Sequence, residues 1–143
     1  MASRSAVPVA GLLLALLAGC GAGPVDRADL ESAVAVTFDN LYGVQQQRIG
    51  RSGAHDAGAS ASCDKGGPTV ADEGTGEDWS CLVTFVSGDG SLSQVAYELQ
   101  VKTDACYRAS GPASAIIGTP RLTTPQGDVD NPLIEFDGCT RAR

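Results

Sequence analysis

Residues 79–102, "WSCLVTFVSGDGSLSQVAYELQVK", decide the fold of this chain. Side chains alternate in two runs, 79–86 and 95–102, and a cluster of serine, glycine and aspartate at 87–91 separates them. The alternating, mostly apolar positions are Trp79, Cys81, Val83, Phe85, Val95, Tyr97, Leu99 and Val101. Period-2 alternation on both sides of a Gly-rich turn predicts a β-hairpin with one buried face. Because the first run is apolar on much of its second face too, we expect it in the centre of a sheet or with that face against a helix.

Two shorter segments extend this sheet. "ACYRAS" (105–110) predicts a third strand and "PLIEF" (132–136) predicts a fourth. The segment between them, "GPASAIIGTPRLTTPQGDVDNP" (111–132), is interrupted by prolines and glycines. We interpret it mainly as loop, with a short apolar segment at 115–117.

The segment that follows Asp26 has the pattern of a helix. Asp26 is a suitable N-cap, and Leu30, Val34, Phe38 and Leu41 fall on one face of a 3.6-residue period. We expect the helix to end between residues 43 and 50. A lipid-facing amphipathic helix would carry Lys and Arg on its polar face, whereas this one carries acidic residues and glutamines. The apolar stripe is therefore expected to pack on the sheet.

The predicted fold class is α+β: an N-terminal helix on a small antiparallel meander of three to four strands, with two disulfides. An all-β sandwich is the alternative, but too few strands are visible. Residues 26–143 are expected to form this single domain. Residues 50–62, rich in Gly, Ala and Ser, are expected to form a flexible loop within it.

The N-terminus has the composition of a targeting segment. One positive charge, Arg4, precedes an apolar run of signal-peptide length, and Leu17-Ala18-Gly19-Cys20 follows it. These four residues resemble the lipobox of bacterial lipoproteins. The resemblance implies that residues 1–19 are cleaved, that Cys20 carries lipid, and that residues 20–25 tether the domain to the outer face of the cell membrane. The alternatives are an ordinary secretory signal or a short membrane anchor with a coincidental cysteine.

The remaining four cysteines form an even set, which suits an oxidising compartment. Three pairings are possible. We favour Cys63–Cys81 and Cys106–Cys139, because each closes a contiguous block of sequence. A four-thiolate zinc site is the alternative, but it requires closely spaced cysteine pairs that this chain lacks.

The charge balance argues against nucleic acid as a partner. The formal net charge is −7, and the 10 basic residues are scattered along 143 positions. We expect a solvated acidic surface. No phosphate-binding loop, dinucleotide fingerprint or zinc-protease motif is present, so no cofactor is predicted.

Three groups of polar residues are candidates for chemistry. His55 lies beside Asp56, but a Gly/Ala/Ser loop offers little rigid support for a catalytic pair. Glu77 and Asp78, together with Asp104, are candidate carboxylates for a hydrolase. Asp128, Asp130 and Asn131 provide oxygen ligands that suit Ca²⁺, although the register of an EF-hand is missing.

The mature domain is similar, at the level of pattern, to small uncharacterised disulfide-containing envelope lipoproteins of actinobacteria. "EDWSC" (77–81) and the strand "YELQV" (97–101) carry this resemblance, which brings no catalytic residues. The expected function is that of a non-catalytic binding or accessory module of the cell envelope, anchored to the membrane through Cys20. The alternative is a small envelope hydrolase that uses paired carboxylates.

Overall fold

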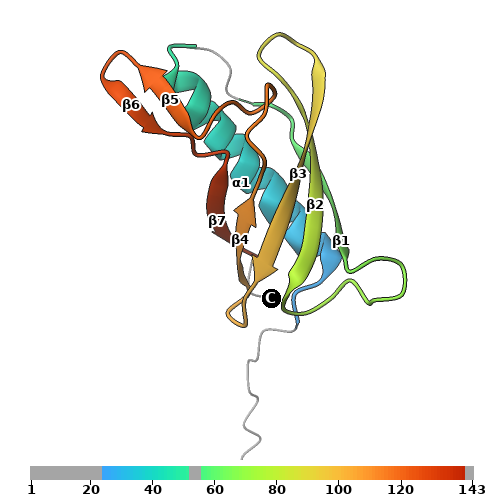
Figure 1. The fold of residues 1–143 in the computed structure, drawn as a ribbon. Coiled ribbons are helices and arrows are strands. Elements are labelled where there is room, and N and C mark those ends of the chain that lie inside the picture. Colours follow the sequence, from blue (N-terminus) through green and yellow to red (C-terminus); the bar gives the residue numbers. More distant parts are fainter. Residues whose placement is uncertain (1–23, 52–55, 141–143) are drawn as a thin grey trace, which may run out of the picture.

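The computed structural model describes residues 24–51 and 56–140, which fold as a helix and an antiparallel sheet (Figure 1). The elements are α1 (Arg27–Arg48), β1 (Ser60–Lys65), β2 (Gly76–Val86), β3 (Leu92–Val101), β4 (Cys106–Ser110), β5 (Arg121–Thr124), β6 (Gly127–Asp130) and β7 (Glu135–Cys139).

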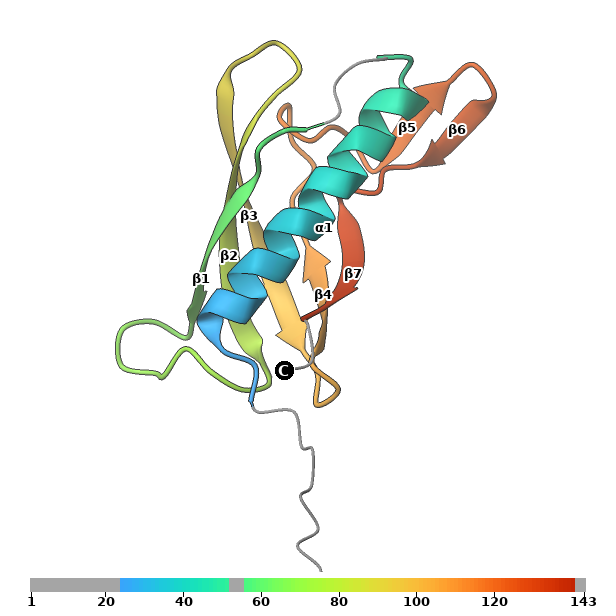
Figure 2. The same ribbon diagram turned by 180° about the vertical axis from the view of Figure 1, so that it is seen from behind.

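The main sheet has five strands in the order β1-β2-β3-β4-β7, and every neighbouring pair is antiparallel. Strands β5 and β6 form a separate hairpin, inserted between β4 and β7. Helix α1 lies across one face of the sheet (Figure 2). The predicted α+β fold class is therefore confirmed, with a larger sheet than the three to four strands expected.

Helix α1 begins and ends as its sequence predicts. The Asp26 carboxylate accepts the N–H of Asp29 at 2.8 Å, and the helix ends at Arg48 with Ile49 as its C-cap. The face toward the sheet is buried, with Tyr42 in the place that we expected for Leu41. The buried positions are Leu30, Val34, Phe38, Tyr42, Gln45 and Gln46.

The β2–β3 hairpin supplies the other half of the core. Val83 faces Val95 across the two strands, and its side chain is fully buried. The ring of Phe85 lies 4.7 Å from that of Phe38, centroid to centroid, which joins sheet to helix. The second face of β2 is open to solvent, since Leu82 is 41% exposed.

Three segments differ from the sequence-based expectation. Strand β1 starts at Ser60, inside the segment predicted as a loop, because its pairing with β2 gives a short polar strand a partner. Strand β7 starts three residues later than predicted. The β5–β6 hairpin lies in a segment that we predicted to be mainly loop. Most positions of its strands are polar, so the sequence lacks the apolar alternation that predicts a strand.

Both predicted disulfides are present, and each joins an edge strand to its neighbour. Cys63 and Cys81 are directly opposite in β1 and β2, with Cα atoms 4.1 Å apart; this buried disulfide lies on the helix side. Cys106 and Cys139 are opposite in β4 and β7, with Cα atoms 3.8 Å apart. We call this second bridge the outer disulfide. It lies on the face of the sheet away from α1, the same face as the exposed polar side chains of β4 and β7.

Candidate functional site

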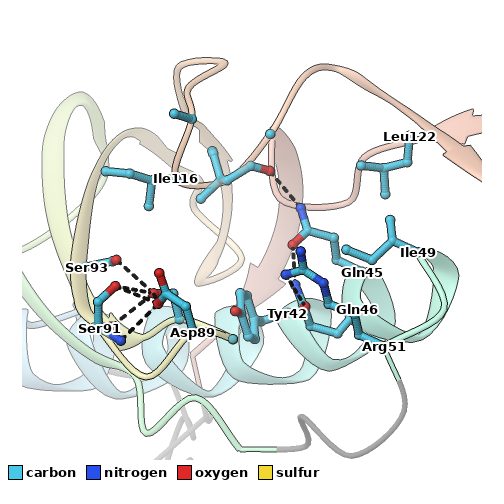
Figure 3. A pocket seen from close by; sticks show the side chains of 15 residues that line it. Tyr42, Gln45, Gln46, Ile49, Arg51, Asp89, Ser91, Ser93, Ile116 and Leu122 are labelled. Atoms are coloured by element: carbon cyan, nitrogen blue, oxygen red, sulfur yellow. Dashed lines mark hydrogen bonds between the residues drawn. The ribbon is translucent and has the colours of Figure 1, made fainter.

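A cavity of about 520 Å³ lies at the C-terminal end of α1, between the β2–β3 turn and the segment after β4 (Figure 3). Its volume is in the range of small-molecule sites, which is about 300–1,000 Å³. The lining residues are Tyr42, Gln45, Gln46, Ile49, Arg51, Ser87, Gly88, Asp89, Ser91, Ser93, Ala115, Ile116, Ile117, Gly118 and Leu122. We call this cavity the helix-end pocket.

The β2–β3 turn provides an anionic wall. The Oδ1 atom of Asp89 accepts the hydroxyls of Ser91 and Ser87 at 2.7 and 2.8 Å and the N–H of Ser91 at 2.9 Å. These hydrogen bonds, those from Ser91 first, lower the pKa of Asp89 to about 2. The carboxylate is therefore ionised across the physiological pH range and is held in place by the turn.

The end of α1 provides the opposite wall through a buried amide network. Gln45 Nε2 donates to the carbonyl of Ile117 at 2.7 Å and to Asn131 Oδ1 at 3.0 Å. Asn131 Nδ2 in turn donates to the carbonyls of Ile117 and Thr119 at 2.7 and 2.9 Å. Gln46 completes the network by donating to Gln45 Oε1 at 3.1 Å. The network fixes the 117–119 backbone against the helix.

Arg51 places a positive charge on the same wall. Its backbone N–H donates to the carbonyl of Gln46 at 2.8 Å, which fixes the start of the side chain. Its guanidinium reaches Gln46 Oε1 only at 3.4 Å, and it forms no ion pair with any carboxylate of residues 24–51 or 56–140. The pocket thus has one ordered anion and one cation with unused donors, on opposite sides (Figure 3).

Apolar side chains complete the pocket. Ile117 and Leu122 are buried, whereas Ile116 is 46% exposed at the mouth. Among the residues that the structure describes, the lining includes neither a histidine nor a cysteine. Charged groups, hydroxyls and an apolar surface together suit reversible binding of a small polar molecule.

The carboxylates considered for a hydrolase lie elsewhere. Glu77 Oε1 accepts the amide of Gln100 at 2.6 Å on the open face of the sheet, and Asp104 caps the β3–β4 turn by accepting the N–H of Cys106 at 3.1 Å. Asp78 lies in the same bulge of β2 as Glu77. None of these three carboxylates lines the helix-end pocket.

The three residues considered for calcium have separate roles. Asp128 accepts the hydroxyl of Thr123 at 3.0 Å, and Asp130 pairs with Arg121 at 3.1 Å, both on the surface of the β5–β6 hairpin. Asn131 is buried in the amide network. In the described part of the chain, no group of three or more His, Cys, Asp or Glu side chains is arranged to hold a metal ion.

The described residues do not include Cys20, residues 20–23 of the predicted tether, or His55. Within the described residues, the sequence analysis missed Gln45 and Gln46 as site residues. A signal was present: these glutamines continue the buried stripe of α1 into its last turn, where apolar residues would be expected. Buried amides at such positions require hydrogen-bond partners, and so indicate a polar cluster.

No helix among the described residues has the length and apolar character needed to cross a membrane. No family model, curated protein or solved structure matches the chain.

Proposed function

We propose that this protein is a lipid-anchored, extracytoplasmic binding module and that the helix-end pocket is its ligand site. The observation that carries the proposal is the opposition, across a cavity of small-molecule size, of the ordered Asp89 carboxylate and the Arg51 guanidinium, which has no ion-pair partner among the described residues. Such a site favours a small molecule with a carboxylate, an ammonium or both, and with an apolar group that contacts Ile116 and Leu122.

Two features support the extracytoplasmic location. The lipobox-like Leu17-Ala18-Gly19-Cys20 precedes the domain, and two disulfides join neighbouring strands of the sheet, as is typical of proteins from oxidising compartments. In this proposal the diacylglyceryl group is attached to the Cys20 sulfur.

The arrangement of helix and pocket suits a membrane-tethered receptor. Cys20 precedes the start of α1 by only a few residues, whereas the pocket lies at the opposite end of this helix. A 22-residue helix is about 33 Å long. An anchor at Cys20 would therefore leave the pocket facing away from the lipid, accessible to solutes of the envelope.

The ligand proposal is tested by NMR titration of the purified protein with leucine, with the dipeptide alanyl-leucine, and with acetate and methylamine as single-charge probes. We expect the zwitterionic probes to shift the amides of Asp89, Arg51 and Ile117. Arg51→Gln and Asp89→Asn should each weaken binding at least tenfold. Lys102→Gln and Glu98→Gln, which make the same charge changes on exposed positions of the sheet and its β3–β4 turn, should not. Shifts outside the pocket, or equal binding by all four variants, would refute the assignment.

The anchoring proposal has a separate test. Intact-mass analysis of protein extracted from membranes should show added lipid, and the Cys20→Ser form should be released as an unlipidated protein. A wild-type protein that is recovered without lipid at Cys20 would contradict it.

The alternative function, a small envelope hydrolase, requires two carboxylates about 5–10 Å apart across a cleft. Glu77, Asp78 and Asp104 line neither the helix-end pocket nor the two cavities lined by residues 29–37 with Cys139 and by residues 113–123. The observations on these side chains therefore favour binding over hydrolysis.

A further inference from the structure

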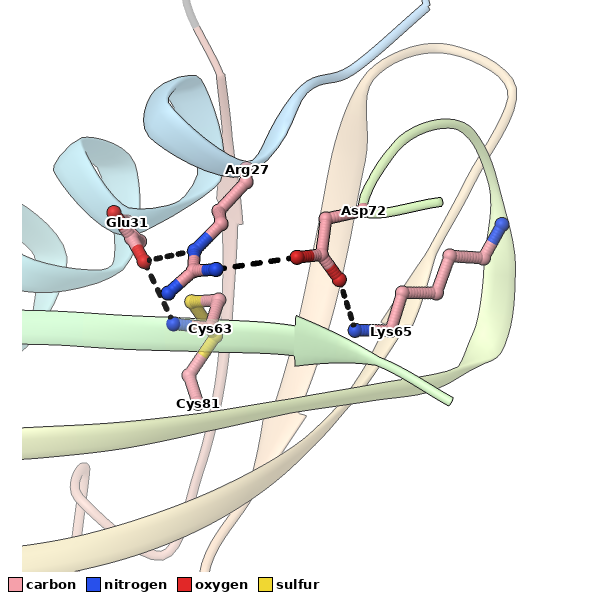
Figure 4. The surroundings of a disulfide bond; sticks show 6 residues. All are labelled: Arg27, Glu31, Cys63, Lys65, Asp72 and Cys81. Atoms are coloured by element: carbon pink, nitrogen blue, oxygen red, sulfur yellow. Dashed lines mark hydrogen bonds and ion pairs between the residues drawn. A yellow bond between two sulfur atoms is a disulfide. The ribbon is translucent and has the colours of Figure 1, made fainter. Parts of the chain in front are cut away.

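The two edges of the main sheet differ, and β1 is the closed one. Its outward N–H groups are accepted by carboxylates: that of Cys63 by Glu31 at 2.9 Å and that of Lys65 by Asp72 at 2.8 Å (Figure 4). Arg27 holds both acids in place, at 2.9 Å from Glu31 and 3.2 Å from Asp72. These carboxylates take up two of the outward donors of β1, and Asp39 accepts the N–H of Ala59 just before the strand at 3.2 Å, so β1 offers few donors to another strand.

Strand β7 is the open edge. Thr140 donates to the carbonyl of Ala105 and Gly111 donates to that of Ile134, so the even-numbered backbone groups face β4. In an antiparallel pair, the N–H and C=O groups of Glu135, Asp137 and Cys139 must then point away from the sheet. No acceptor from the described residues lies within hydrogen-bond distance of these three N–H groups, in contrast to β1. Figure 2 shows β7 at the margin of the sheet, beside α1.

A groove accompanies this edge on the helix side. A cavity of about 360 Å³ is lined by Cys139 and by one flank of α1, including Ala33, Val36 and Thr37. Val36 is 57% exposed on this flank of the helix. A strand added to β7 would place alternate side chains in this groove, where small apolar groups fit against Ala33 and Val36.

The opposite face of β7 is acidic. Glu135 and Asp137 share a single guanidinium, that of Arg108, at 3.5 and 3.3 Å. One cation between two carboxylates leaves a net negative charge at the edge, on a chain whose formal charge is −7. A Lys or Arg directly across from Asp137 on an added strand would complete the pairing.

We propose that β7 binds an extended segment of a partner protein by strand addition. The partner segment carries Lys or Arg on alternate residues, facing Glu135 and Asp137, and small apolar residues between them, facing Ala33 and Val36. A second copy of this chain fits poorly, because antiparallel pairing of β7 about its own centre would place Asp137 opposite Asp137. This interaction surface is distinct from the helix-end pocket.

The test uses the capped pentapeptide KVKVK as the probe, EVEVE as the charge-reversed control, and the purified full chain. Hydrogen exchange and NMR titration should show KVKVK slowing exchange at the amides of Glu135, Asp137 and Cys139, with no effect on β1. Binding should weaken at least fivefold in Asp137→Lys and stay within twofold of wild type in Glu98→Lys. Glu98→Lys makes the same charge change on the same face, inside the sheet on exposed β3.

Three results would overturn the proposal: equal binding of EVEVE, perturbations mapped away from β7, or unchanged binding by Asp137→Lys with native circular dichroism. Sedimentation that shows a concentration-dependent dimer lost in Asp137→Lys would assign the edge to a second copy instead.

Discussion

The substitution Asn131→Asp separates a structural role for this side chain from the calcium role that its sequence context suggested. Asn131 is 4% exposed, and its Nδ2 group donates to two carbonyls, those of Ile117 at 2.7 Å and Thr119 at 2.9 Å. A carboxylate has no donor at this position and is nearly the same size. The substitution therefore removes two hydrogen bonds without creating a cavity.

The size of the stability loss depends on which hydrogen-bond partners remain after the substitution. The Ile117 carbonyl keeps its bond from Gln45 at 2.7 Å, whereas the only side-chain donor to the Thr119 carbonyl is lost. Loss of the part-buried bond to the Thr119 carbonyl costs about 1 kcal/mol, and a buried carboxylate that faces two carbonyl oxygens costs about 1–3 kcal/mol more. We expect the free energy of unfolding to fall by about 3 kcal/mol at pH 7, out of a total of about 5–15 kcal/mol.

The loss of stability caused by Asn131→Asp should be smaller at low pH. Burial beside carbonyl oxygens raises the pKa of the introduced carboxyl above its value in the unfolded chain, so the folded state binds the proton more tightly. Stability relative to wild type then rises as pH falls through the folded-state pKa, and the protonated group can donate to one carbonyl again.

Urea denaturation at pH 7 and pH 4 measures both effects, with fluorescence from Trp79, the only tryptophan, which is buried in the core. Asp130→Asn is the control, since this neighbour is exposed and pairs only with Arg121 on the surface; its effect should stay within about 1 kcal/mol. The reasoning is refuted if Asn131→Asp unfolds like wild type, or if millimolar Ca²⁺ stabilises it more than the control.

Three further perturbations test the packing around the site. Replacing both cysteines of a bridge by alanine should cost about 3 kcal/mol for the buried disulfide and about 4 kcal/mol for the outer one from chain entropy alone. For the buried disulfide, removing two sulfur atoms from the core costs about 1 kcal/mol more for each atom, so its loss should cost more in total than loss of the outer disulfide. Urea titrations that rank the outer disulfide as more stabilising would contradict this. The carboxylate of Asp39 accepts two backbone N–H groups before β1, and burial raises its pKa. The stability of the wild-type protein relative to Asp39→Asn should therefore increase as pH falls from 7 toward 4. The opposite trend in paired thermal melts would contradict this prediction. Gly138→Ala would place a methyl group against the Tyr107 ring, and a loss of about 2 kcal/mol is expected; an unchanged melting temperature would mean that the ring moves freely.

The parts of the fold that could be predicted are those where one face of an element is buried. The alternation of Trp79 to Phe85 and the stripe from Leu30 to Phe38 exist because these side chains pack against each other. The disulfide pairing could be predicted because β1 and β2 are consecutive strands, and β7 is the next strand of the main sheet after β4, with only the β5–β6 hairpin inserted between them. The β5–β6 hairpin could not, because its polar strands stand apart from the main core.

The candidate site was much less predictable. Its walls come from the end of α1, the β2–β3 turn and the 115–118 segment, which meet only after the sheet has formed. Asp89 looks like an ordinary turn residue in the sequence, and Arg51 borders a Gly-rich stretch. The acidic motifs that attracted attention, including Asp128 and Asp130, are surface pairs within one hairpin. Only the buried glutamines carried a local signal.

The sealed edge at β1 limits how large an assembly this sheet can enter. A sheet with two open edges accepts strands at both ends and can grow into a fibre. Here the carboxylates of Glu31 and Asp72 take up two donors of β1, so β7 is the more open edge of the main sheet within the described residues. Strand addition is then favoured at one edge of the sheet, which limits how far the sheet can grow from this chain.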